Sequence, residues 1–112
     1  MVIYEVNVTV AAEAAHEYRI WLEQHVLDLL VLPGFIAAEI SEIEDPRPAD
    51  GATGFVVHYK LQTHAALDAY LRDFAPQVRA RGEERFPGQF RISRRVLAMV
   101  HERRAPIPED LE

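Results

Sequence analysis

An indole next to an imidazole is the first pair of side chains in this sequence that could carry chemistry. Trp21 and His25 are four residues apart, so they share one face if this stretch is helical. A histidine against an aromatic wall in a groove can accept or donate a proton. The alternative is a tryptophan packed in the core with a histidine at its edge, and we favour this simpler interpretation.

A second group of polar side chains is expected on one face of a sheet. Asn7 and His58 fall on two predicted strands at positions that point to the same side, with Glu5 and Lys60 nearby. Such a group can hold a small polar ligand, or it can be a hydrogen-bond network at an interface, which we favour. Two cavities are therefore possible, one inside a barrel of two sheets and one under the helices. The candidate pocket residues are Tyr4, Asn7, Trp21, His25 and His58.

Signatures of metal, phosphate and nucleophile sites are missing. The histidines show neither HExxH nor short paired spacing, and the chain has no cysteine. The scattered glycines fit neither GxGxxG nor GxxxxGK(S/T). Ser41 and Ser93 lie within predicted strands and not on a nucleophile elbow. We therefore expect no metal site and no cofactor.

Hydrophobic periodicity predicts the elements that position these residues. Period-two alternation predicts strands over 2–10, 35–44, 54–62 and 90–100. Helical spacing predicts one helix over 11–32 and another that begins after the N-cap Thr63, with Pro76 kinking it or starting a further short helix. Ile20 and Leu27 widen the apolar stripe of the first helix, so we expect it to bury more than one side.

The order βαββαβ predicts a ferredoxin-like α+β fold. Two right-handed crossovers give a four-stranded antiparallel sheet in the order 4-1-3-2, with the helices on one face. We expect a single domain over 1–104 and a Pro-rich acidic tail over 105–112. The residues expected to pack against the helices are Val6, Val8, Val57, Tyr59, Val96 and Val100.

The opposite face of the sheet is expected to meet a second copy of the chain. It mixes apolar residues such as Ile3 and Leu97 with charged ones, which makes it a poor solvent-facing surface. Two-fold homodimers are the commonest assembly, although a monomer with one wet sheet face is the alternative. The candidate interface residues are Glu5, Lys60, Arg91 and Arg95.

Charge and composition exclude some partners. The net charge of −6 and the pI of about 5.3 argue against a nucleic-acid surface. No apolar run approaches the roughly 20 residues of a membrane span, and the alternating start of the chain is typical of a strand, not a signal peptide. With no cysteine, the composition fits a reducing compartment, so we expect a cytoplasmic protein.

Several strings resemble a family of short proteins known as a domain of unknown function. They are IYEVNVTV, WLEQHVLDLL, LPGF, LDAYLRDFAPQVRARGEERF and FRISRRVL, and the resemblance extends from Val2 to about Val100. That family is placed in the dimeric α/β-barrel group, in which two ferredoxin-like sheets close into a barrel. The resemblance implies this fold and a homodimer, and it implies no functional residues.

The same group includes cofactor-free oxygenases of aromatic polyketides and haem-degrading enzymes. The haem-degrading members use a strand asparagine, a tryptophan and an axial histidine on the second helix. Here Asn7 is expected to point away from the helices, Trp21 lies on the first helix, and the second helix has only His64 at its start. The sequence thus departs from the haem pattern.

Three functions remain open. The first is a homodimeric barrel protein that binds or senses a small molecule, with no assigned reaction. The second is a cofactor-independent oxygenase or related small enzyme, with Trp21, His25, Tyr4, Tyr18 and Tyr70 lining a groove within one chain that is open to solvent. The third is a structural or partner-binding subunit.

Overall fold

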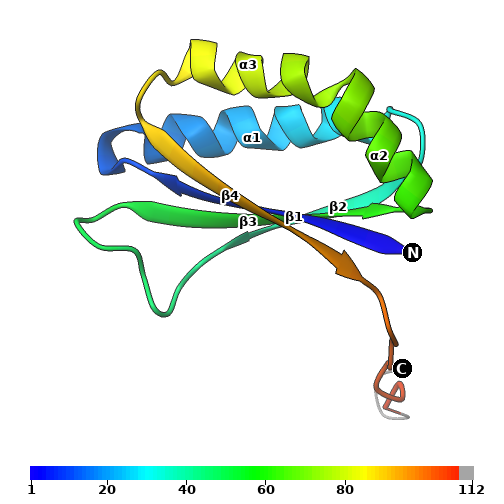
Figure 1. Cartoon of the computed structure of the whole chain (residues 1–112). Helices are drawn as coiled ribbons and strands as arrows, with labels where there is room; N and C mark the ends of the chain where they lie inside the picture. Colours follow the sequence, from blue (N-terminus) through cyan, green and yellow to red (C-terminus); the bar gives the residue numbers. More distant parts are fainter. Residues whose placement is uncertain (109–112) are drawn as a thin grey trace.

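The computed structural model describes residues 1–108 and consists of one sheet covered on one side by helices (Figure 1). The strands and helices alternate in the predicted order, and a short 3-10 turn precedes the first helix. In chain order the elements are β1 (Val2–Val10), η1 (Ala12–Ala14), α1 (Ala15–Leu30), β2 (Phe35–Glu42), β3 (Thr53–Leu61), α2 (His64–Asp73), α3 (Ala75–Arg85) and β4 (Phe90–Ala98).

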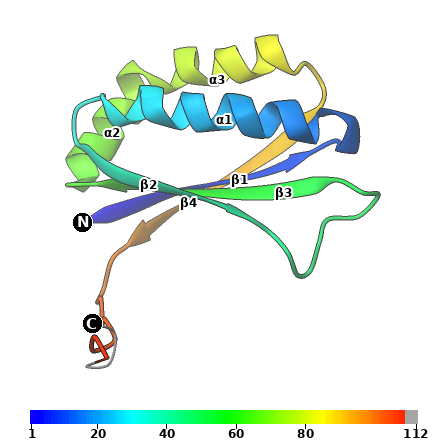
Figure 2. The ribbon, with the colours of Figure 1, turned by 180° about the vertical axis from the view of Figure 1, so that it is seen from behind.

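The sheet has the predicted topology. Its strand order is β2-β3-β1-β4, and all three neighbouring pairs are antiparallel. Both views show the helices on the same side of the sheet (Figures 1 and 2). The βαββαβ order, the ferredoxin-like fold and the strand order 4-1-3-2 are therefore confirmed, with strand ends that differ from the predicted ones by one or two residues.

The core lies between the sheet and the helices because alternate strand residues point to that side. On β1 these are Val2, Tyr4, Val8 and Val10, each at most 4% exposed. The helical layer contributes Leu29 of α1 and Phe86, which directly follows α3, and fully burying a side chain of this size stabilises the fold by roughly 1.5–3 kcal/mol. This packing fixes which residues of every strand face the helices.

Proline and threonine positions divide the second helical region. The Thr63 hydroxyl accepts a hydrogen bond from the amide of Ala66 at 3.1 Å, which confirms it as the N-cap of α2. Pro76 lies in the first turn of α3, where its missing amide hydrogen costs nothing. Of the two predicted effects of Pro76, the structure therefore has the start of a second short helix.

Four apolar residues are more exposed than the sequence analysis predicted. Val96 is 50% exposed because β4 is an edge strand, and Val100 lies beyond the end of β4 and is 93% exposed. Ile20 and Leu27 are each 58% exposed, so the expectation that α1 buries more than one side is wrong for them. They lie on the side of the helix that turns away from the sheet.

Two segments project beyond the sheet on the side without helices. They are the loop between β2 and β3 and the chain after β4 (Figures 1 and 2). Within the predicted tail 105–112, residues 105–108 are exposed and have no regular secondary structure, and 109–112 lie outside the described residues. Within 1–108, no helix is long and apolar enough to cross a membrane.

Candidate functional site

A cavity of about 620 Å³ lies between the helices and the sheet. Its walls come from α1, α3 and the helix-facing residues of β1, β3 and β4, and one residue of α2 also contributes. Gly82 of α3 lines it, since a Cβ added there would lie 3.4 Å from Phe90 and 3.5 Å from Trp21. The tyrosines that line it are each at most 4% exposed, so the cavity is narrow where they lie.

The structure separates the predicted pocket residues into two places. Tyr4, Trp21 and His25 line the cavity under the helices. Asn7 and His58 lie on the other face of the sheet, beside Glu5. The alternation of β1 sends Tyr4 and Asn7 to opposite faces, so the five candidate residues belong to the two possible sites and not to one.

Trp21 and His25 form the α1 wall of the cavity. Their rings stack at 4.4 Å between centroids, and Tyr18 lies 5.4 Å from the tryptophan. Burial, helped by the nearby positive charge of Arg81, lowers the pKa of His25 to about 4. The imidazole is thus neutral near pH 7, with free capacity to accept a hydrogen bond from a ligand.

All four tyrosines of the chain line this cavity. The Tyr4 hydroxyl accepts a hydrogen bond from Arg79 Nη2 at 3.3 Å, whereas Tyr18, Tyr59 and Tyr70 make no hydrogen bond to residues 1–108. Burial raises the pKa of Tyr18 and of Tyr70 to about 12 and raises that of Tyr59 further. All three phenols therefore stay protonated and are available as donors.

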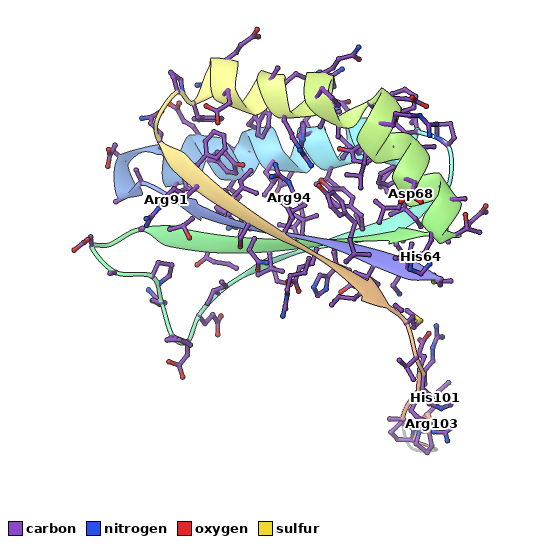
Figure 3. The ribbon with its side chains drawn as sticks, viewed as in Figure 1. His64, Asp68, Arg91, Arg94, His101 and Arg103 are labelled. Atoms are coloured by element: carbon purple, nitrogen blue, oxygen red, sulfur yellow. The ribbon has the colours of Figure 1, made fainter. Side chains whose placement is uncertain are left out.

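Charged side chains lie at the rim of the cavity. Arg94 is opposite Val6 in the β1–β4 register, so it belongs to the helix-facing side of the edge strand. Figure 3 shows Arg94 extending from β4 toward the helices, with Arg91 nearer the start of the strand. Arg79 and Glu83 of α3 complete the rim.

Arg79, Arg94 and Tyr59 line the cavity but are not among the predicted pocket residues. Tyr59 is predicted only to pack against the helices. The helix-facing positions of Tyr4, Tyr59 and Arg94 on three neighbouring strands were a usable signal. The contribution of Arg79 depends on how α3 sits over the sheet, which no local pattern contains.

The open face of the sheet has a buried carboxylate at its centre. Glu5 is 4% exposed, and Arg95 binds it through Nε at 2.5 Å and Nη2 at 3.0 Å. Asn7 donates to it at 2.9 Å, and His58 Nε2 lies 2.8 Å away and must donate because an ionised carboxylate only accepts. These four residues are called the Glu5 network below.

The other candidate interface residues surround this network. Lys60 pairs with Ile3 in the β1–β3 register and is partly buried on the open face. Arg91 is opposite Thr9 at the far end of β4, where it also borders the cavity. Glu39, which is opposite His58, is exposed.

The side chains present do not fit the haem pattern of the barrel group. Asn7 is on the open face, and His64 is exposed at the start of α2 and does not line the cavity (Figure 3). His25 is the histidine that borders the cavity, but it stacks on Trp21 from α1. Among residues 1–108, no three His, Cys, Asp or Glu side chains are grouped to hold a metal ion.

The Glu5 network is expected to contribute stability that disappears in acid. Its hydrogen bonds to Arg95, His58 and Asn7 lower the pKa of Glu5 from 4.5 to about 2. Because the folded pKa is the lower one, the contribution is complete above about pH 4.5 and is lost as the pH falls toward 2. Glu5→Gln should lower the free energy of unfolding by about 2 kcal/mol at neutral pH, measured by urea denaturation.

Glu39→Gln is the matched control, since Glu39 is exposed in the same row of the sheet, and it should change stability by less than about 0.5 kcal/mol. The difference between wild type and Glu5→Gln should shrink as the pH is lowered through 4.5. A difference that stays constant down to about pH 3 would contradict the assigned role of the carboxylate.

Comparisons with known proteins agree with this architecture. No curated protein matches the sequence. Several solved structures share the fold. One is MhuD, a haem degrader from Mycobacterium tuberculosis whose structure has two haems bound in its active site. It is 18% identical to this chain, with a TM-score of 0.65, and the match covers 91% of this chain and 98% of MhuD. SnoaB, a cofactor-independent oxygenase from Streptomyces nogalater, has 16% identity and a TM-score of 0.62 over 96% and 98%.

HapK from Hahella chejuensis is similar at 14% identity, with a TM-score of 0.64 over 95% of this chain and 99% of its own. At these identities the similarity shows the fold alone. The family comparison is more direct, because its match covers nearly the whole described structure. The domain of unknown function DUF4286 matches residues 1–100, and the chain belongs to this family.

Proposed function

We propose that this protein is a homodimer that binds a small, flat and largely apolar molecule in the cavity between helices and sheet. The observation that carries the proposal is the cavity itself. Its volume of about 620 Å³ lies within the 300–1,000 Å³ typical of small-molecule sites. Its walls combine aromatic rings with a few polar groups, which is the usual composition of such sites.

The shape of the walls favours a flat ligand. Trp21, His25 and Tyr18 present ring faces and edges along α1, and Phe90 closes the side next to β4. Stacking against aromatic rings rewards planar molecules. MhuD, whose structure holds two haems in its active site, shows that this fold can accommodate large flat molecules.

The homodimer is supported by the composition of the open face. Ile3, Val56 and Leu97 are partly buried there although no helix covers them. The charge of Glu5 is already compensated within the chain, so covering it costs less than covering an unpaired carboxylate. The β2–β3 loop and the chain after β4 project on this side and flank the face (Figure 2).

A second candidate is a cofactor-independent oxygenase that uses the same cavity. The specific observation is the neutral His25 imidazole, which is stacked on Trp21 at the wall and could accept a proton from a bound phenol or acidic C–H group. The resulting anion would transfer one electron to dioxygen. Recombination of the two radicals would form a C–O bond, and the peroxide anion would take the proton back from His25 to give a hydroperoxide. SnoaB, which shares the fold, is such an oxygenase. With a pKa of about 4, His25 is a weak base, so we place binding first.

Filling the cavity should weaken the binding of a neutral flat probe. Gly82→Leu extends a side chain from α3 toward Trp21 and Phe90, and replacing glycine also favours the helix. Fluorescence titration with N-phenylnaphthylamine should show affinity at least about tenfold weaker than in wild type.

Gly82→Ala is the matched control, because its added methyl group makes only ordinary contacts with Trp21 and Phe90. It should keep most of the affinity and raise the free energy of unfolding by about 0.5–1 kcal/mol. Equal binding by wild type and Gly82→Leu would show that the probe does not use this cavity, and the binding proposal would fail.

A charge placed on the open face should dissociate the dimer. Leu97→Glu adds a carboxylate to the proposed interface, and sedimentation equilibrium should show dissociation at least about tenfold stronger than in wild type. Leu27→Glu, on the exposed outer side of α1, is the control and should leave the dimer intact. A wild-type mass of 12.8 kDa at micromolar concentration would refute the dimer.

The oxygenase candidate predicts dioxygen uptake with a hydroxylated anthrone and without added metal or cofactor. His25→Phe keeps an aromatic ring against Trp21 but removes the proton acceptor, so the rate should fall at least about a hundredfold. His64→Phe, at an exposed position outside the cavity, should keep the wild-type rate. Absence of uptake in the wild type would leave the protein as a binding module.

A further inference from the structure

We propose that the cavity ligand is an aromatic acid, and that Arg94 and the tyrosine hydroxyls form the subsite for its anionic oxygen group. This inference rests on the proposed binding function and specifies the chemical class of the ligand. The subsite has two parts, a set of hydroxyls inside the cavity and an arginine at its rim. The hydroxyls favour a ligand with a hydrogen-bond acceptor, and the arginine favours one with a negative charge.

The buried hydroxyls have donors with no acceptor. Tyr18, Tyr59 and Tyr70 are each 3% exposed, yet their hydroxyls make no hydrogen bond to residues 1–108. No fully enclosed side-chain nitrogen or oxygen of residues 1–108 lacks a partner, so these three hydroxyls keep some access to solvent, and their side chains line the cavity. They can therefore donate a hydrogen bond to water or to an acceptor of a ligand in the cavity.

Several of the tyrosine rings also lie near one another. Between ring centroids, Tyr4 lies 6.1 Å from Tyr59 and 5.9 Å from Tyr70. Tyr18 and Arg94 line the same cavity from α1 and β4. The arginine and the tyrosines therefore border one space that a ligand can occupy.

Arg94 has no carboxylate partner within residues 1–108, in contrast to the next residue along the chain. Arg95 points to the open face and binds Glu5 with two nitrogens. Arg94 points to the cavity, where its guanidinium is unpaired in the described structure (Figure 3). A guanidinium presents a planar fork of donors that matches a carboxylate or similar group.

The rim has a positive balance that favours the same ligand. Arg79, Arg91 and Arg94 border the cavity with Glu83 as the acidic residue. The Arg79 guanidinium is held over the cavity by its hydrogen bond to Tyr4. Since burial keeps the phenols protonated, they donate hydrogen bonds and do not repel an anion.

Two matched dyes test the proposal. Anilinonaphthalenesulfonate and N-phenylnaphthylamine share their ring system, but only the first has an anionic oxygen group. In Arg94→Gln, affinity for the sulfonate should fall roughly tenfold to a hundredfold, because a charge-assisted contact is lost, while affinity for the neutral dye should change less than about twofold. Tyr18→Phe should weaken the sulfonate by a further few-fold and spare the neutral dye.

Arg103→Gln is the control for net charge, since Arg103 lies in the exposed segment after β4, away from the cavity (Figure 3). It should leave both affinities unchanged. Displacement of the sulfonate by naphthoate but not by naphthamide would show that a carboxylate also fits the subsite, and equal displacement by both would count against it.

The outcomes separate this inference from the binding proposal. If neither dye responds to Gly82→Leu, the cavity is not the binding site and the proposed function fails. If both dyes respond to Gly82→Leu but Arg94→Gln affects them equally or not at all, the cavity binds flat molecules without an anion subsite. Thermal unfolding of Arg94→Gln close to wild type confirms that a lost affinity reflects the site and not the fold.

Discussion

The two-residue period of β1 controls both polar sites of the molecule. Tyr4 and Glu5 are consecutive, so one must face the helices and the other the open side. Because β1 is a central strand, with β3 and β4 as its neighbours, both side chains lie at the middle of the sheet. Each face therefore has a polar group where apolar packing would be expected. The Tyr4 hydroxyl and the Glu5 carboxylate both need hydrogen-bond partners at these positions.

The two faces compensate in different ways. On the open face, Arg95, His58 and Asn7 saturate the Glu5 carboxylate, so the network is complete within one chain. Under the helices, the tyrosine hydroxyls border a cavity and Arg94 has no acidic partner in the described structure. A complete network can rigidify a structure, whereas donors that reach a cavity without a protein acceptor can serve a ligand. This contrast supports the two proposals, that a ligand binds on the helix side and that a second copy packs on the open side.

The sequence predicted the fold well because the fold depends on local patterns. Alternation in 2–10 and 54–62, helix breakers at Pro33-Gly34 and the N-cap at Thr63 each specify an element boundary, and connection rules then select the sheet order. Gly34 adopts φ +85°, and a Cβ there would lie 2.4 Å from that of Ala66, so this glycine also permits the turn to pack against α2. Such local patterns can be recognised in the sequence without knowledge of the tertiary structure.

The site was less predictable because it depends on distances between elements. The alternation placed Tyr4 and Asn7 on opposite faces, yet it could not reveal that α3 leaves a space above β4 or that Arg79 reaches Tyr4. The exposure of Val96 also depends on the distances between elements, since an edge strand such as β4 is covered only where a helix extends over it. The sequence shows which side chains could do chemistry, but the cavity depends on how the helices pack on the sheet.

The adjacency of Arg94 and Arg95 links the two faces through β4. Arg95 holds this edge strand to the central Glu5 by two hydrogen bonds, and the backbone between the two arginines has little freedom within a paired strand. The register that brings Arg95 to Glu5 therefore also brings Arg94 opposite Val6 at the cavity. A one-residue slip of β4 would exchange the two arginines between the faces. It would also turn Ile92, which is opposite Val8, from the helix side to the open face, so the burial of apolar residues specifies the same register. The Glu5 network thus has a second effect besides neutralising a buried charge: together with the apolar packing, it holds β4 in the register that places Arg94 on the cavity side of the sheet.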